Sequence, residues 1–204
     1  MGSVLSAEGL ACRRGMRRLF RDVKFEAHPG EVVWIKGSNG RGKSSLLRLL
    51  AGIVPPDEGQ VSLASGASSA FIGHANALKD DLTALENLRF MAGLRGLSVE
   101  LSELQSALKT LGLAGRENSP VRTFSQGQRR RVALARLALE KSPGLWILDE
   151  PFDALDTAGT AVLGRVLAGH VAQGGSVVLT SHLELSAVVP DLAPVREWIL
   201  GAGT

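Results

Sequence analysis

Residues 37–44, with the sequence GSNGRGKS, have the types and spacing of a phosphate-binding loop. Glycines let successive backbone N–H groups turn toward phosphate oxygens, and a helix starting directly after the loop adds partial positive charge. Lys43 would then reach the β- and γ-phosphates of a nucleotide, and the Ser44 hydroxyl would bind Mg²⁺. A glycine-rich structural turn is the alternative. The nucleotide-binding residues predicted in this segment are Gly37, Ser38, Asn39, Gly40, Arg41, Gly42, Lys43, Ser44 and Ser45.

Two adjacent carboxylates, Asp149 and Glu150, follow the apolar run Leu145–Leu148. If this run is a buried strand, the pair lies where ligands of parallel sheets bind, at the carboxyl ends of the strands. We expect Asp149 to join Ser44 in holding the metal ion. We expect Glu150 to be the general base that polarises an attacking water. A capping or turn role before Pro151 is the alternative.

Short apolar runs rich in valine and isoleucine alternate with helical patterns along the chain. Buried strands separated by helices imply a largely parallel sheet covered on both faces, so the predicted fold class is α/β. Four runs predict strands: Val32–Ile35, Ala70–Ile72, Leu145–Leu148 and Val177–Leu179. Four patterns predict helices: Ser44–Leu50, Leu104–Leu111, Val132–Leu139 and Ala161–Val171.

The stretch from Leu82 to Arg122 shows helical patterns without a convincing strand. Thr83 and Glu86 have the spacing of a capping box at a helix start. Glycine and proline punctuate the chain, but no long linker or internal repeat interrupts it. We therefore expect one domain over residues 1–204, with a small helical subdomain at about residues 82–140 inserted in the α/β core.

The composition is that of a globular domain, with 204 residues of which 45% are hydrophobic and 21% charged. Such a chain buries a core without disulfides. Its single cysteine, Cys12, cannot form an internal bridge, which favours a reducing compartment. No apolar run approaches the roughly 18–20 residues of a membrane-spanning helix, and the N-terminus lacks a secretory signal. We expect a chain that neither spans a membrane nor is exported.

The net charge is +3, and basic residues cluster at positions 13–18 and 129–131. Such clusters are usually solvated faces, with contact to phosphate or anionic lipid as the alternative. For Arg130 we expect a solvated helix face.

Three further motifs resemble those of ATP-binding cassette (ABC) ATPases. Residues 124–128 (FSQGQ) resemble the signature motif, residues 154–156 (ALD) the D-loop, and residues 181–182 (SH) the H-loop. With the phosphate loop and the acidic strand, the family's motifs follow in order over essentially the whole chain. The resemblance implies a P-loop NTPase core of the ABC-ATPase type, with a mostly parallel sheet, an N-terminal antiparallel β portion and a small inserted helical subdomain. It also implies ATP and Mg²⁺ as cofactors.

In this family two ATPase subunits enclose two nucleotides, so the resemblance implies a second subunit in a homodimer. Ser125 and Gly127 stand at a predicted helix start, where hydroxyl and N–H groups can bind phosphate, and the resemblance assigns them to ATP held by the partner. A plain helix cap is the alternative. The resemblance also implies that His182 is catalytic beside Glu150 and that Asp156 belongs to the nucleotide site.

Two positions depart from the family's pattern. His74 stands where a glutamine usually touches Mg²⁺ or the attacking water. Imidazole can hydrogen-bond water and respond to pH, although it suits Mg²⁺ poorly. We expect a catalytic role in water positioning or coupling, with an ordinary strand-end histidine as the alternative. Arg14 replaces the aromatic residue that stacks on adenine; its guanidinium can stack on a purine, and solvent exposure is the alternative.

Residues 73–90, GHANALKDDLTALENLRF, resemble a subfamily, the haem-exporter ATPases of bacterial cytochrome c maturation, in which that histidine is a marker. This resemblance implies ATP-driven haem export or release of a haem-loaded chaperone. It implies integral-membrane transporter subunits as partners, haem-handling membrane proteins indirectly, and no nucleic acid. The implied location is peripheral, on the cytoplasmic face of the bacterial inner membrane.

Three other functions remain as alternatives. The nearest is the ATPase subunit of another ABC transporter, for lipids or small solutes. A non-transport ABC protein acting on DNA or ribosomes usually carries two cassettes in one chain or large insertions. A P-loop kinase or GTPase would leave the FSQGQ segment unexplained.

Overall fold

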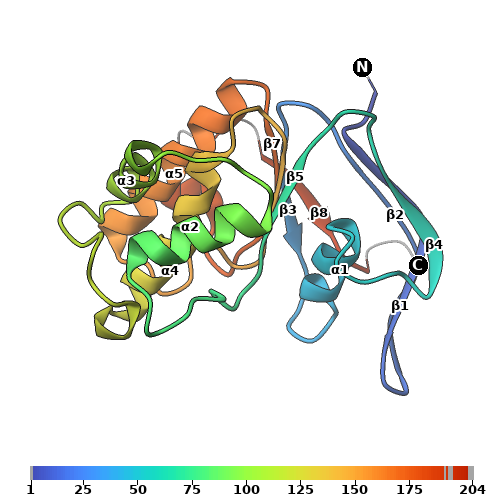
Figure 1. Ribbon diagram of the computed structural model, residues 1–204. Helices are drawn as coiled ribbons and strands as arrows, with labels where there is room; N and C mark the ends of the chain where they lie inside the picture. The colour runs from blue at the N-terminus through green and yellow to red at the C-terminus, as the bar shows by residue number, and fades with distance from the viewer. Residues whose placement is uncertain (1, 191, 193–194, 202–204) are drawn as a thin grey trace.

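Figure 1 shows the computed structural model, which describes residues 2–190, 192 and 195–201. The strands are β1 (Leu5–Arg14), β2 (Arg17–Ala27), β3 (Val32–Lys36), β4 (Glu58–Leu63), β5 (Ser69–Ile72), β6 (Leu145–Leu148), β7 (Ser176–Thr180) and β8 (Val195–Ile199). The α-helices are α1 (Lys43–Leu50), α2 (Ala84–Leu94), α3 (Leu101–Thr110), α4 (Gln126–Ala135), α5 (Thr157–Ala172) and α6 (Leu185–Val188). Two 3₁₀ helices are η1 (Val121–Thr123) and η2 (Arg136–Leu139).

Five strands form a parallel sheet in the order β5-β6-β7-β3-β8. Every residue of β6 and β7 is buried, as expected for strands covered on both faces. The four predicted strands are confirmed as β3, β5, β6 and β7. The strand β8 has no counterpart among the predictions, because its sequence VREWI mixes charged and apolar residues at the sheet edge.

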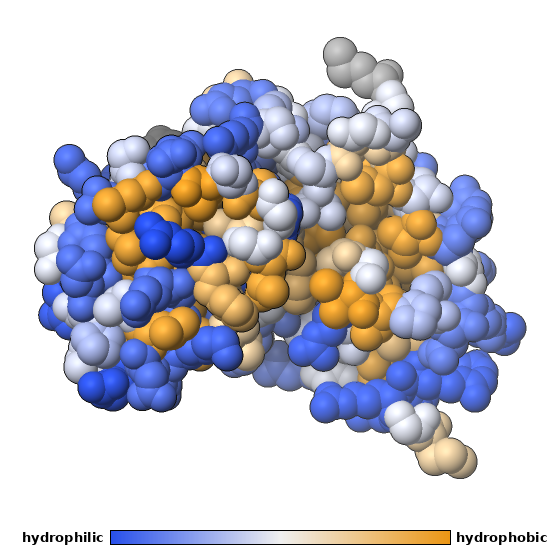
Figure 2. Space-filling model, in the orientation of Figure 1, coloured by the Kyte–Doolittle hydropathy of each residue, from blue (hydrophilic) through white to orange (hydrophobic). Residues whose placement is uncertain are grey.

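A second sheet is antiparallel, in the order β2-β1-β4, and confirms the N-terminal antiparallel portion. A Cβ atom on Gly59 would lie 2.3 Å from the Glu8 carbonyl oxygen, so β4 can approach β1 only with glycine there. The β1–β2 turn protrudes from the molecule with Met16 fully exposed (Figure 1). Figure 2 shows hydrophilic side chains around this hairpin. The exposed arginines of the hairpin are Arg13, Arg14, Arg17, Arg18 and Arg21.

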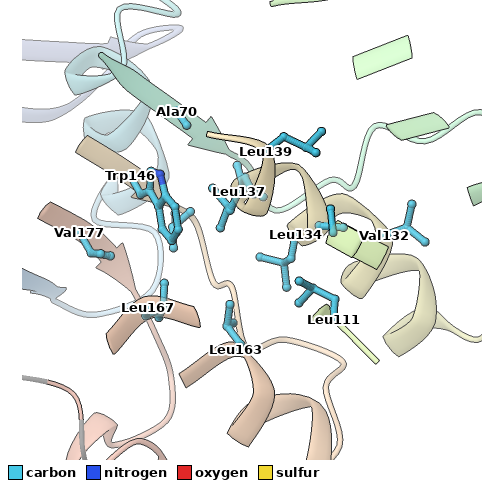
Figure 3. Close-up of a cluster of buried hydrophobic side chains, with 14 of the residues drawn as sticks. Ala70, Leu111, Val132, Leu134, Leu137, Leu139, Trp146, Leu163, Leu167 and Val177 are labelled. Atoms are coloured by element: carbon cyan, nitrogen blue, oxygen red, sulfur yellow. The ribbon is translucent and has the colours of Figure 1, made fainter. Parts of the chain in front are cut away.

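Two hydrophobic cores cover opposite faces of the parallel sheet. Along β3, Val32 and Trp34 belong to one core and Val33 and Ile35 to the other, as the two-residue period of a strand requires. The first core lies between the sheet and the helices α2–α5; Figure 3 shows part of it around Trp146. The second core lies between the two sheets and contains the buried leucines of α1. The helix that follows the phosphate loop is therefore held between both sheets (Figure 1).

Helices α2, α3, α4 and η2 form the segment between β5 and β6. The predicted capping box is confirmed at α2: Thr83 Oγ1 accepts a hydrogen bond from the Glu86 N–H, and the Glu86 carboxylate accepts one from the Thr83 N–H. The helix predicted at Val132 begins earlier, at Gln126, and continues as η2. Within the described residues, no helix is long and apolar enough to cross a membrane.

Candidate active site

The predicted phosphate loop connects β3 to α1. Gly42, the residue before the helix, has a φ of 102°, which favours glycine. A Cβ atom there would also lie only 3.1 Å from the Leu19 side chain. Lys43 Nζ donates a hydrogen bond to the Gly37 carbonyl oxygen at 2.7 Å, so the lysine side chain crosses the loop. The first N–H groups of α1 are left to bind an anion.

Asp149 lies at the end of β6 and is 1% exposed. Its Oδ1 accepts hydrogen bonds from the Ser44 hydroxyl and the Thr180 hydroxyl, at 3.0 Å each. Its Oδ2 is buried and has no hydrogen-bond partner among the described residues. A buried carboxylate oxygen without a donor fits a cation, because hard ions such as Mg²⁺ bind oxygen ligands.

The oxygen atoms of Ser44 and Asp149 are of the kind that Mg²⁺ accepts as ligands. No group of three or more His, Cys, Asp or Glu side chains suitable for a metal occurs in the described part of the chain. Mg²⁺ commonly uses one or two protein oxygens and takes its other ligands from substrate phosphates and water. Ser44 and Asp149 supply such a pair.

Glu150 combines burial with an unusual backbone. Its φ of 48° is a left-handed conformation, which costs a residue other than glycine about 1–3 kcal/mol. Its N–H donates to Thr180 Oγ1 at 2.9 Å, and its Oε2 accepts from the His182 N–H at 3.0 Å. Burial raises the pKa of Glu150; Asp153 and Asp149 act in the same direction, whereas His182 opposes them. A raised pKa moves the carboxylate toward the range of a general base.

Both predicted histidines lie beside acidic groups. His182 Nε2 is 3.5 Å from Glu150 Oε1, and His74 Nδ1 is 3.5 Å from Asp153 Oδ2. Both rings are more than half exposed. Asp153 was not singled out in the sequence, and its only sequence signal is its place three residues after Glu150.

These groups line one cavity of about 300 Å³. It brings together residues from the loop, the β1–β2 hairpin and the ends of β5, β6 and β7. The hairpin contributes Arg14, which is exposed, and Leu19, which no sequence motif marks. Gly37, Ser38 and Arg41 belong to the loop but not to the cavity lining. The lining residues are Arg14, Leu19, Asn39, Gly40, Gly42, Lys43, Ser44, Ser45, His74, Asp149, Glu150, Asp153 and His182.

Three further predicted site residues, Ser125, Gly127 and Asp156, also lie outside this cavity, at the starts of two helices. Ser125 caps α4: its Oγ accepts from the Gln128 N–H at 3.2 Å. Asp156 caps α5 by accepting from the Gly159 N–H at 2.7 Å. Gly127 packs against the turn before α5, where a Cβ atom would lie 2.6 Å from the Ala154 carbonyl oxygen. In the single chain, Ser125 therefore has the capping role given above as its alternative.

The solvated helix face expected for Arg130 is wrong. Arg130 is 2% exposed and donates hydrogen bonds to backbone carbonyl oxygens at the end of β6. The physical reason is that Arg130 lies on the buried face of its helix. Residues three, four and seven positions after it, Ala133, Leu134 and Leu137, are all buried. This helical spacing could have revealed the burial, but the neighbouring arginines concealed it.

Several proteins are similar in sequence to this chain over most of its length. Residues 20–153 match the protein family described as ABC transporter. A protein of Nitrosomonas europaea named Cytochrome c biogenesis ATP-binding export protein CcmA is 45% identical, with 89% of this chain and 90% of the relative covered. Proteins of the same name from Dechloromonas aromatica and Pseudomonas putida are 43% identical (97% and 100% covered) and 48% identical (87% and 89% covered).

Solved structures share the fold over nearly the full chain. One described as the ATP binding subunit of an ABC transporter has a TM-score of 0.83 at 27% identity, with 98% of this chain and 89% of that chain covered. A second, from Pyrococcus furiosus, has a TM-score of 0.79 at 23% identity, with 96% of each chain covered, which shows the same fold.

Proposed function

Because this chain belongs to the ABC transporter family and is an ATPase of that family, we propose that it drives a membrane complex that exports haem or releases a haem-loaded chaperone during cytochrome c biogenesis. The observation that carries ATP hydrolysis is the single cavity in which Lys43 and Ser44 face Asp149 and Glu150. The haem and cytochrome c part rests on the names of the relatives, together with the residues around His74.

In the proposed reaction, Lys43 and the start of α1 bind the β- and γ-phosphates of ATP. The Glu150 carboxylate takes a proton from water as the water oxygen attacks the γ-phosphorus, and ADP leaves with the electrons of the broken P–O bond. The His182 backbone N–H holds Oε2 of that carboxylate, and the exposed His182 ring lies 3.5 Å from Oε1, the oxygen that would face the water. We propose that this ring acts beside Glu150 in the reaction.

Ser44 and Asp149 are the proposed Mg²⁺ ligands. The bound ion would neutralise charge on the β- and γ-phosphates. His74, paired with Asp153, is proposed to position the attacking water. Arg14, which lines the cavity, is proposed to stack on the base.

Replacement of Glu150 by glutamine tests the general base. The amide keeps the size of the side chain but cannot accept the proton, so we expect normal ATP binding and loss of hydrolysis by about 100-fold or more. Binding of a fluorescent ATP analogue and phosphate release are the measurements. Hydrolysis at the wild-type rate in Glu150→Gln would exclude this assignment.

The proposed partners are a second copy of the chain and integral-membrane transporter subunits, which would hold the protein peripherally on the cytoplasmic face of the bacterial inner membrane. Haem-handling membrane proteins would be contacted indirectly. Purification from membranes in mild detergent, with mass identification of the co-purifying subunits, tests this part.

Deletion of the gene tests the haem and cytochrome c part. We expect loss of holocytochrome c, detected by haem staining and spectroscopy, and restoration by the wild-type gene but not by the Lys43→Ala gene. Intact holocytochrome c in the deletion strain would point instead to an ABC transporter of another solute.

A further inference from the structure

A buried arginine of α4 holds the turn at the end of β6. Arg130 Nη2 donates hydrogen bonds to the carbonyl oxygens of Asp149 and Glu150, at 2.9 Å each, and its Nε donates to that of Pro151 at 3.3 Å. The first two oxygens belong to the two peptide units that flank Glu150. Since Glu150 has a positive φ, its backbone conformation persists only where the surroundings fix it.

The same guanidinium holds the loop that follows β5. Arg130 Nη1 donates to the Gly73 carbonyl oxygen at 2.9 Å and to Asn76 Oδ1 at 3.1 Å. These contacts lie on either side of His74 in the sequence. Arg130 therefore joins the ends of β5 and β6 to the helix that begins after Ser125.

We propose that Arg130 is a positioning residue for ATP hydrolysis, which orients Glu150 and the His74 loop relative to α4 without touching ATP. The inference rests on the proposed function. A planar guanidinium with five N–H donors suits this role, because it binds several oxygens in fixed directions, whereas lysine offers a single ammonium group. Among the described residues, none of the hydrogen bonds of Arg130 goes to the phosphate loop, so ATP affinity should not depend on Arg130.

Steady-state ATP hydrolysis tests the proposal, measured on the full chain with the membrane subunits that co-purify with it. We expect Arg130→Met to lower kcat about 100-fold, as a displacement of about 1 Å can, with KM for ATP within about twofold of wild type. Arg130→Lys should restore part of the lost kcat. A loss of kcat below about tenfold in Arg130→Met would overturn the proposal.

Arg136→Met is the control for removal of an arginine from the same helical segment; Arg136 is partly buried. Arg136 Nη2 donates to the Phe71 carbonyl oxygen at 2.8 Å and Nη1 contacts Met91 Sδ at 3.4 Å; neither contact involves Glu150 or the His74 loop. We expect both methionine variants to melt at lower temperature, but Arg136→Met to keep kcat within about threefold of wild type. Equal losses of kcat in the two variants would mean that Arg130 is only structural.

Arg130→Lys decides the question if Arg130→Met does not fold, because lysine keeps a charged donor in the buried site. A kcat loss of about fivefold or more at unchanged KM then supports the proposal, and a smaller loss contradicts it. Failure of the proposed function looks different, because wild type would then not hydrolyse ATP, or Glu150→Gln would remain active.

Discussion

Thr180 shows how one neutral side chain orders the two acidic groups of the site. Its hydroxyl accepts a hydrogen bond from the Glu150 N–H and donates one to Asp149 Oδ1. A hydroxyl can do both because it carries one donor and two acceptor positions. Asp149 thereby keeps one oxygen bonded within the protein, whereas its Oδ2, the proposed cation ligand, has no hydrogen-bond partner among the described residues. The acidic pair was predictable from its place after an apolar strand, but Thr180 was not, because its contacts cross 30 residues of sequence.

His170 is a buried titratable residue outside the nucleotide cavity. Its ring stacks on Trp146 at 3.6 Å between centroids, and its Nε2 lies 2.9 Å from the Gly144 carbonyl oxygen. Burial lowers the pKa of His170, although the hydrogen bonds to Gly144 and Ser176 oppose this. The folded chain therefore holds the ring neutral at pH values where the unfolded chain takes up a proton.

This pKa shift predicts that stability falls in acid. As pH drops below about 6.5, the unfolded chain gains a proton that folded His170 does not, so the free energy of unfolding decreases. We expect a steeper decrease between about pH 7.5 and 5.5 in wild type than in His170→Gln. Denaturant unfolding at several pH values gives the two slopes, and equal slopes would contradict the assignment.

Helix α4 links the signature residues at its start to the residues at the end of β6. Ser125 caps the helix, Gly127 packs in its first turn against the turn before α5, and Arg130 reaches the end of β6 one turn later. The helix start at Ser125 was predicted from local sequence. Which residues of the helix are buried could not be predicted, because this depends on what packs against the helix.

The close contact at Gly127 predicts opposite effects for two glycine substitutions. In Gly127→Ala the new Cβ meets the Ala154 carbonyl oxygen at 2.6 Å, so we expect the free energy of unfolding to fall by about 1–3 kcal/mol. The control is Gly169→Ala in α5, where nothing lies within 4 Å of the new Cβ and helix propensity should add about 0.5–1 kcal/mol. Equal stability of the two variants in denaturant unfolding would show that the contact relaxes without cost.

At the scale of the whole molecule, the residues predicted to bind nucleotide occupy two separate places. Lys43, Asp149 and Glu150 share one cavity, whereas Ser125 and Gly127 lie outside it. In the proposed homodimer, each site would combine the cavity of one chain with Ser125 and Gly127 of the other.

Mixed dimers test the shared sites. In a dimer of one Lys43→Ala chain and one Ser125→Ala chain, one site would carry both changes and the other neither. We expect this dimer to keep about half of the wild-type ATP hydrolysis, while each variant homodimer loses nearly all of it. Co-expression with two affinity tags isolates the mixed species. A mixed dimer as inactive as the homodimers would contradict independent sites built from two chains.

The sequence by itself determined the α/β class, the phosphate loop, the acidic pair and the capping box at Thr83, because spacing along the chain encodes each of them. Only the tertiary structure decided which residues complete the cavity. Asp153 and Leu19 carry no motif and enter through packing between elements. Arg130 looks solvated beside its neighbouring arginines, yet the fold buries it against backbone carbonyl oxygens that only the assembled sheet presents.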